Sequence, residues 1–120
     1  MTNTRKSLDR PDGTRVLPNR TDALVALGGG TIARSELRPG WRWSNDVRPL
    51  VGTTSCELAH TGYVLSGLLR IETDDGITLD LGPGDVFDVA PGHDAWVVGN
   101  EPCVLLDWAG AIMPAAPAAV

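Results

Sequence analysis

The stretch that decides the fold runs from His60 to Trp96 and reads "HTGYVLSGLLRIETDDGITLDLGPGDVFDVAPGHDAW". Short apolar runs alternate in it with turn signals: an Asp-Gly pair, the sequence Gly-Pro-Gly-Asp from Gly82, and a Pro-Gly pair at Pro91. The part "LLRIETDDGITLDL" has two alternating segments around Asp-Gly, which is typical of a β-hairpin. The stretch therefore predicts a series of short antiparallel strands.

The rest of the chain continues this pattern. Among its 120 residues are 14 glycines and nine prolines, and no long window repeats apolar residues at helical spacing. The predicted strands are 23–27, 31–37, 56–65, 67–73, 77–81, 85–90, 95–98 and 104–108. Strands this short and numerous favour a closed barrel or a sandwich, because closure or a second sheet removes exposed edges. We expect one all-β domain with little or no helix.

Composition divides the chain into three parts. Residues 1–20 form a polar N-terminal arm, with an edge or swapped strand expected near 15–17. Residues 21–110 are expected to form the barrel. Residues 111–120 are rich in alanine and proline and carry little that could be buried, so we expect a disordered tail.

The charge balance argues against several kinds of partner. The net charge is −5, and Lys6 is the single lysine beside nine arginines. Nucleic acids and anionic membranes require clustered positive charge, so we expect neither as a partner. The arm lacks the apolar core of a secretory signal, and no run approaches the length of a membrane span. We therefore expect a cytoplasmic protein.

Several motifs together resemble the cupin superfamily over roughly residues 40–108. They are "GYVLSG" followed by "LGPGDVF", and also "PGWRWS" and "PGHDAWVVGNEP". The last two are similar to a subgroup of small single-domain bacterial cupins that has no settled activity. The resemblance implies a double-stranded β-helix, or jelly-roll barrel, which frequently forms a homodimer.

The metal-binding pattern implied by the resemblance is altered here. Many cupins use two histidines separated by one residue, then a glutamate, then a third histidine. At the corresponding positions this chain has Thr54 and Cys56, then His60, then Ala95. Only Cys56 and His60 can act as ligands at these positions.

A different site can be built from the residues present. If 56–65 is a regular strand, Cys56 and His60 point to the same face. His93 follows the Pro-Gly turn and could enter the mouth of the barrel beside them. One thiolate and two imidazoles suit Zn²⁺ with an open fourth position. Fe, Mn, Ni and Cu are further candidates. With such a metal, His60 and His93 are the candidate catalytic residues.

Two alternatives stay open for these residues. In the first, the pocket holds no metal, Cys56 and His60 are packed or hydrogen-bonded inside it, and His93 caps a turn. In the second, Asp94 orients His93 as a general base. Adjacent residues of a strand point to opposite faces, so this second arrangement requires a bulge.

The candidate substrate-binding residues are mostly aromatic. Trp41 and Trp43 alternate around Arg42, which places both rings on one face of a strand. Either they line a pocket for a planar or apolar ligand, or they pack in the core or in a dimer interface. Arg42 or Arg48 is the candidate partner for a ligand carboxylate. Tyr63 and Trp96 complete the set. The segment 44–55 is expected to be an irregular loop, either a lid over the barrel mouth or an ordinary surface loop.

Two functions remain open at this point. The first is a metal-dependent enzyme acting on a small molecule, of isomerase, lyase, cyclase or oxygenase type. The second is a metal-free cupin module that binds or senses a small ligand without catalysis. The fold alone does not distinguish them.

Overall fold

The computed structural model describes residues 3–109 and consists mainly of β-strands. The strands and two short helices are β1 (Gly13–Leu17), β2 (Arg20–Leu27), β3 (Gly30–Leu37), α1 (Trp43–Asp46), α2 (Arg48–Val51), β4 (His60–Ser66), β5 (Leu69–Thr73), β6 (Thr78–Leu81), β7 (Val86–Val89), β8 (His93–Val97) and β9 (Cys103–Asp107). Within this part of the chain, no helix has the length and apolar character needed to cross a membrane.

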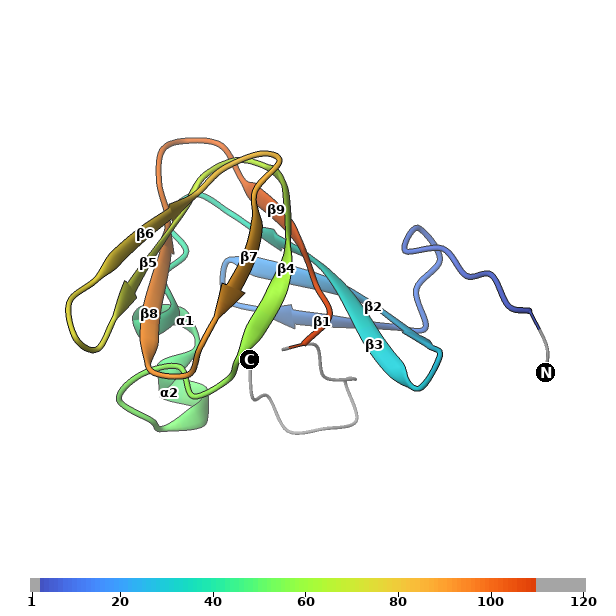
Figure 1. Ribbon diagram of the computed structural model, residues 1–120, viewed down its shortest axis with the longest axis horizontal. Coiled ribbons are helices and arrows are strands. Elements are labelled where there is room, and N and C mark those ends of the chain that lie inside the picture. Colours follow the sequence, from blue (N-terminus) through green and yellow to red (C-terminus); the bar gives the residue numbers. More distant parts are fainter. Residues whose placement is uncertain (1–2, 110–120) are drawn as a thin grey trace.

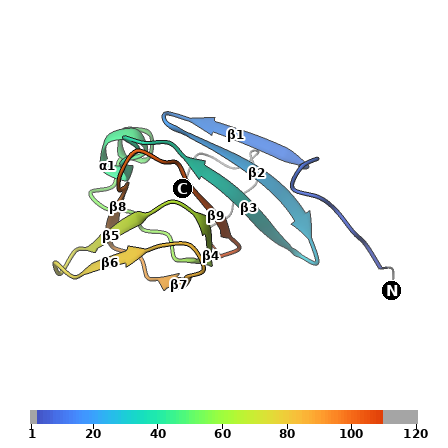
Figure 2. The same cartoon turned by 90° about the horizontal axis from the view of Figure 1, so that it is seen from above.

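Two antiparallel sheets form the molecule. The larger sheet, sheet A, has the order β1-β2-β3-β9-β4-β7, and the smaller one, sheet B, has the order β6-β5-β8. From β4 onward the chain passes back and forth between the sheets, with β4, β7 and β9 in sheet A and the β5–β6 hairpin and β8 in sheet B, so it winds around a common interior (Figure 1). The β2–β3 hairpin and β1 extend from this barrel as an arm of sheet A (Figure 2). This is the predicted all-β double-stranded β-helix.

The core lies between the two sheets because most central strands alternate buried residues with residues that are more exposed. On β8, for example, His93, Ala95 and Val97 are buried and the residues between them are only partly buried. Val64 of β4 and Leu105 of β9 meet Ile71 of β5 across the interior in one cluster of buried side chains. The sequence pattern of period two thus places one face of every central strand inside.

The observed elements differ from the predicted ones in three places. The predicted strand 56–65 is wrong in its first part, because β4 begins only at His60. The predicted irregular segment 44–55 contains most of α1 and all of α2. The expected strand carrying both Trp41 and Trp43 is wrong, because α1 begins at Trp43. The edge strand expected near 15–17 belongs to β1, which pairs with β2 at one edge of sheet A. The predicted tail, 111–120, lies outside the described residues.

Gly62 is required by the close approach of β4 and β9. A Cβ atom at this position would lie 1.8 Å from the Leu106 carbonyl oxygen and 2.7 Å from Cζ of Phe87. The Leu106 carbonyl oxygen belongs to the backbone of β9, which is paired with β4 and cannot move away. A side chain here would therefore separate two strands that carry the interior residues.

We expect Gly62→Ala to destabilise the protein by about 3 kcal/mol, the upper end of overpacking effects. The matched control is Gly30→Ala, whose Cβ would lie 3.9 Å from its nearest neighbour, the Leu27 carbonyl oxygen. Urea unfolding of both variants measures the difference. Equal unfolding midpoints would contradict the role assigned to Gly62.

Candidate metal centre

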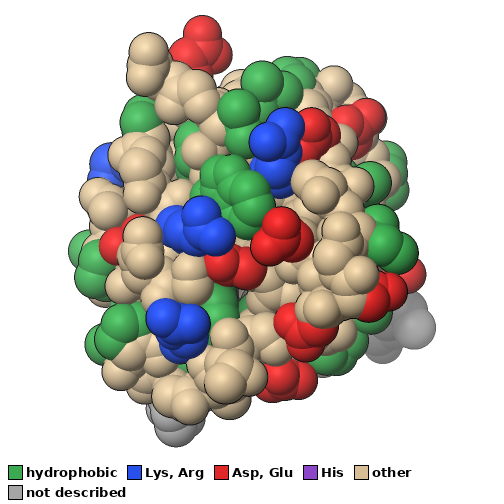
Figure 3. Space-filling model, turned by 90° about the vertical axis from the view of Figure 1, so that its left-hand side faces the viewer, with side chains coloured by type: hydrophobic (Ala, Val, Ile, Leu, Met, Phe, Trp, Pro, Cys, Tyr) green, Lys and Arg blue, Asp and Glu red, His purple; other side chains and the backbone are tan. Residues whose placement is uncertain are grey.

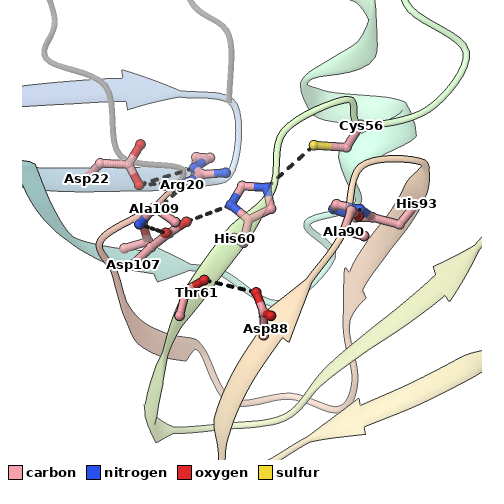
Figure 4. A network of polar contacts seen from close by, with 11 residues as sticks. Arg20, Asp22, Cys56, His60, Thr61, Asp88, Ala90, His93, Asp107 and Ala109 are labelled. Atoms are coloured by element: carbon pink, nitrogen blue, oxygen red, sulfur yellow. Dashed lines mark hydrogen bonds and ion pairs between the residues drawn. The ribbon is translucent and has the colours of Figure 1, made fainter.

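Three side chains that can bind a metal converge between the two sheets. They are Cys56, His60 and His93, and their candidate ligand atoms all lie within 4.8 Å of one another. The Cys56 sulfur lies 3.5 Å from Nε2 of His60, and the two imidazole rings meet edge to face with centroids 5.4 Å apart. Figure 4 shows the thiol and the two rings facing one interior point. The convergence predicted from the sequence is present.

Cys56 reaches this point by a route that the sequence did not predict. It does not share a strand with His60. Instead, it forms an isolated antiparallel bridge with His93, in which its N–H donates to the His93 carbonyl at 2.7 Å. The prediction that one strand presents both Cys56 and His60 is therefore wrong. The thiol is attached to the edge of sheet B, whereas the His60 imidazole comes from sheet A.

The segment before Cys56 is held by a small polar network. The Ser55 hydroxyl lies 3.1 Å from a carboxylate oxygen of Glu57 and 3.1 Å from one of Asp74, and its single hydrogen is shared between these two acceptors. The backbone N–H of Asp74 donates in turn to the Gly92 carbonyl at 2.9 Å, and the Gly92 N–H donates to the Cys56 carbonyl at 2.7 Å. These bonds join the β5–β6 hairpin, the Cys56 segment and the start of β8. They fix the thiol relative to His93.

His60 is oriented by Asp107, the last residue of β9. The Asp107 carboxylate accepts a hydrogen bond from Nδ1 of His60 at 2.6 Å. Since a carboxylate can only accept when ionised, Nδ1 carries the proton and Nε2 points to the Cys56 sulfur. This is the arrangement in which a histidine ligand is held by a second carboxylate partner.

His93 is the first residue of β8, and its side chain is 2% exposed. Its Nδ1 donates to the Ala90 carbonyl oxygen at 2.8 Å, and a carbonyl fixes the tautomer because it only accepts. The neighbouring Asp94 points outward, where it accepts from Arg42 at 3.2 Å and from the Ser44 N–H at 3.0 Å. The His93–Asp94 general-base pair is therefore not formed.

The electrostatics of the pair Cys56–His60 follow from this geometry. Burial alone raises the pKa of the Cys56 thiol, but hydrogen bonds from His60, His93 and the Leu58 N–H outweigh it and lower that pKa to about 6. Burial alone lowers the pKa of His60, but its bonds to Asp107 and Cys56 raise it to about 9. Without a metal, the pair at neutral pH is thus a thiolate and an imidazolium.

The three groups line a cavity of about 60 Å³ between the sheets. It also contains the predicted Trp41 and Trp43, and otherwise its wall is mainly apolar. The complete lining is Arg20, Ser35, Leu37, Trp41, Trp43, Cys56, His60, Leu69, Ile71, Leu81, Phe87, Val89, His93, Ala95, Leu105 and Asp107. The two tryptophans are 4% and 3% exposed, so they combine core packing with cavity lining.

Three predicted substrate-binding residues do not line the cavity: Arg42, Tyr63 and Trp96. Arg42 lies over the Trp96 ring, with its guanidinium carbon 4.3 Å from the ring centroid, and pairs with Asp94. Trp96 has the parity opposite to the buried Ala95 and Val97 on β8, and Arg42 forms an isolated bridge with it. On the face of the molecule shown in Figure 3, acidic and basic side chains surround a small apolar patch. Tyr63 follows the inward-facing Gly62 on β4 and takes the opposite parity. Arg42 therefore does not lie where it could bind the carboxylate of a ligand in the cavity.

Sequence reasoning missed Asp107 and Arg20. Asp107 ends the apolar run "CVLLD", and a carboxylate with inward parity in such a run requires a partner when buried. This pattern is sufficient to predict from the sequence that Asp107 has a buried partner. Arg20 was assigned to the N-terminal arm, but its side chain enters the cavity from the start of β2. The sequence contains no comparable signal for Arg20, because its inward direction depends on how β2 pairs.

Comparison with solved structures identifies the fold. A protein of unknown function (DUF1255) from Acidithiobacillus ferrooxidans is 25% identical over 80% of this chain and 86% of its own, with a TM-score of 0.57. The polyketide cyclase RemF from Streptomyces resistomycificus is 18% identical, with 90% and 80% covered and a TM-score of 0.61. An RmlC-like cupin from Shewanella frigidimarina is 15% identical, with 92% and 93% covered and a TM-score of 0.60. The sequence matches no protein-family model and no curated protein.

We expect the metal-free protein to show the ultraviolet absorbance of one thiolate at neutral pH, because the pKa of Cys56 is lowered to about 6. Acidification through that pKa protonates the sulfur and removes the band. Cys56→Ser should abolish the band. Cys103→Ser should retain it, because burial raises the pKa of Cys103 to about 11. A band that survives in Cys56→Ser would contradict this assignment.

Proposed function

Because this chain has the double-stranded β-helix fold of the cupins, we propose that it is a small-molecule cupin with a transition metal held by Cys56, His60 and His93. The observation that carries the proposal is the state of the two imidazoles. Each has its Nδ1 hydrogen committed, to Asp107 on one ring and to the Ala90 carbonyl on the other. Nε2 of each ring is then the atom that a metal can bind beside a thiolate, and at His60 the metal replaces the proton that Nε2 carries in the metal-free state.

The ligand set favours Zn²⁺ among the candidate metals. One thiolate and two imidazoles are soft and intermediate donors, whereas Mn²⁺ prefers oxygen. Three protein ligands leave a fourth position for a substrate or water, as in catalytic zinc sites. Metal binding at His60 replaces the Nε2 proton of the imidazolium, so Cys56 keeps its thiolate and Asp107 keeps its hydrogen bond. The pair is thus prepared for a cation.

The chemistry of such a site is that of a Lewis acid. When bound there, a zinc ion polarises a substrate carbonyl or lowers the pKa of a bound water. The protein supplies an apolar wall that excludes water and a rigid frame of strands on which the ligands are held. Among the isomerase, lyase, cyclase and oxygenase types, this favours the first three. A polyketide cyclase shares the fold, which supports chemistry on a small molecule in this barrel.

One observation favours the alternative, a metal-free module that binds a small ligand. Without an ion, the thiolate, the imidazolium and Asp107 already form a connected chain of hydrogen bonds. Such a chain satisfies each buried charge. The alternative predicts that the cavity binds its ligand equally well after treatment with a chelator.

Cobalt binding separates the two proposals. Untagged protein, freed of metal with a chelator and titrated with Co²⁺, should develop the visible bands of a tetrahedral site and a thiolate-to-cobalt charge-transfer band. Cys56→Ser should remove the charge-transfer band. His60→Gln and His93→Gln should weaken binding by about a hundredfold or more, and Asp107→Asn by about ten- to a hundredfold, because it releases the ring of His60.

Cys103→Ala is the matched control, since Cys103 is buried outside the cavity. Its cobalt spectrum and affinity should equal those of the parent protein. Element analysis of the purified parent identifies the metal acquired during growth. A parent protein that contains no metal and develops no cobalt bands would overturn the metal proposal in favour of the metal-free one.

The resemblance to cupins also implies a homodimer, which we propose here. In the described residues β1 is an edge strand, and its Val16 side chain is 71% exposed. An apolar residue on an open edge supports pairing with a second copy. In sedimentation experiments the parent protein should be a dimer. Val16→Lys should dissociate into monomers at higher protein concentrations than the parent protein does. Monomers in both cases would contradict this proposal.

A further inference from the structure

Away from the three candidate metal ligands, the cavity offers little to a polar ligand. Two further polar side chains of its lining are bonded to each other, since Arg20 donates to Oγ of Ser35 at 3.3 Å. Arg20 also donates to the buried Asp22 at 2.8 Å, and Asp107 accepts from His60 at 2.6 Å. The rest of the lining is aliphatic or aromatic. A ligand with several hydroxyl groups would therefore bury most of them without partners, which is unfavourable.

Ala95 has the smallest side chain of the lining and lies beside a candidate metal ligand. It follows His93 by two residues on β8, and both side chains are buried and line the cavity. Residues two apart in a strand point to the same face. The direct partner of Ala95 on β5 is Ile71, which also lines the cavity. A larger side chain at position 95 would therefore project into the cavity next to the His93 imidazole.

Phe87 limits the cavity from the opposite sheet. It is the direct partner of Gly62 in the pairing of β4 with β7. A Cβ atom at Gly62 would lie 2.7 Å from Cζ of Phe87, so the end of the ring occupies the space that the glycine leaves over β4. Gly62 follows His60 by two residues on this strand and shares its face. The ring of Phe87 is therefore the part of the wall that lies next to the His60 imidazole.

The volume of the cavity restricts the ligand further. A cavity of 60 Å³ has room for about four to six water molecules, and hence for a compact molecule of similar heavy-atom number. A short hydrocarbon chain with one polar group satisfies both this volume and the apolar wall. The polar group would find its partners among Cys56, His60 and His93.

We infer that Ala95 and Phe87 determine which molecules the cavity accepts, and that its substrate is a short-chain aliphatic carbonyl compound. The carbonyl oxygen faces Cys56, His60 and His93, and the hydrocarbon part lies against Ala95 and Phe87. The choice of a carbonyl group rests on the proposed function, because a Lewis acid at these ligands polarises such a group. The selection by size and polarity depends on the cavity alone and requires no metal.

The test is a titration followed at the side chain of Ile71. In protein with ¹³C-labelled isoleucine methyl groups, the Ile71 signal is assigned by its loss in Ile71→Val. The probe is 3-methyl-2-butanone, which should shift this signal in a saturable manner. Dihydroxyacetone has the same number of non-hydrogen atoms but carries two hydroxyl groups, and 2-octanone is a longer ketone. Both should bind about a hundredfold more weakly or worse, the first because its hydroxyl groups lose water without gaining partners, the second because it exceeds the cavity.

Ala95→Leu should weaken the binding of 3-methyl-2-butanone about tenfold or more, because the added carbon atoms occupy the space of the ligand. Since it fills a cavity, the same variant should unfold at an equal or higher urea concentration than the parent protein. Val97→Leu is the matched control: it enlarges a buried side chain on the same face of β8 that does not line the cavity, so ketone binding should equal that of the parent. Unchanged binding to Ala95→Leu, or a lowered unfolding midpoint, would overturn the role of Ala95.

Phe87→Leu tests the opposite wall by a gain of binding. Removing the ring beside His60 should admit 2-octanone and strengthen its binding about tenfold or more relative to the parent protein. A damaged fold would not produce this gain. If 2-octanone remains excluded from Phe87→Leu, the role of Phe87 falls. If dihydroxyacetone and 3-methyl-2-butanone bind equally to the parent protein, the substrate class falls.

The same titration with metal-free and cobalt-loaded protein keeps this inference separate from the metal proposal. If cobalt does not bind but the ketones are still selected by size, the roles of Ala95 and Phe87 stand and the metal falls. If cobalt binds as proposed but the Ile71 signal does not respond to 3-methyl-2-butanone in either form, the metal site stands and this inference falls. If both bind, the ketone should change the visible cobalt bands, because its oxygen takes the fourth position. Unchanged bands would overturn the orientation of the carbonyl group toward Cys56, His60 and His93.

Discussion

The hydrogen bond between Asp107 and His60 is the interaction on which the interior chemistry depends. It joins β9 to β4, fixes the tautomer of the imidazole and directs Nε2 toward the Cys56 sulfur. The lowered pKa of the thiol and the raised pKa of the imidazole both follow from this chain of three groups. Without the carboxylate, a cationic imidazole would be unfavourable at this depth. The barrel thus buries charge in a form that a metal ion can use.

A second buried charge cluster lies on the neighbouring strands of the same sheet. Arg15 and Asp22 are direct partners across β1 and β2, and Asp22 and Ser35 are direct partners across β2 and β3. Burial alone raises the pKa of Asp22, but the charges of Arg20 and Arg15 and the bonds from Arg20 and Ser35 outweigh it, so that pKa is lowered. The arm that extends from the barrel therefore does more than cover an edge, because it holds Arg20 against Trp41 inside the cavity.

Both clusters contribute polar groups to the cavity, whose remaining wall is mainly apolar. The metal ligands come from both sheets: His60 from β4 of sheet A, and His93, with Cys56 bridged to it, from the edge of sheet B. Relative motion of the sheets would separate the thiol from the His60 ring. The close packing at Gly62 fixes β4 against β9 within sheet A, and the polar network around Ser55 fixes the Cys56 segment against sheet B. Each sheet therefore holds its own ligands in place.

The amino-acid sequence by itself determined the class of fold, because strands of period two separated by Gly, Pro and Asp turns encode local geometry. It also identified Cys56, His60 and His93, whose types and positions are unusual enough to select. Only the tertiary structure decided how they meet. Cys56 reaches the site through a bridge to His93 and not through a shared strand, and Arg20 enters from a segment that appeared to be an arm. Arg42 and Trp96 were expected to line the cavity but lie outside it. The face to which a side chain points depends on the register in which its strand is paired. That register is set by pairing between residues far apart in the chain, so a local sequence pattern cannot predict it.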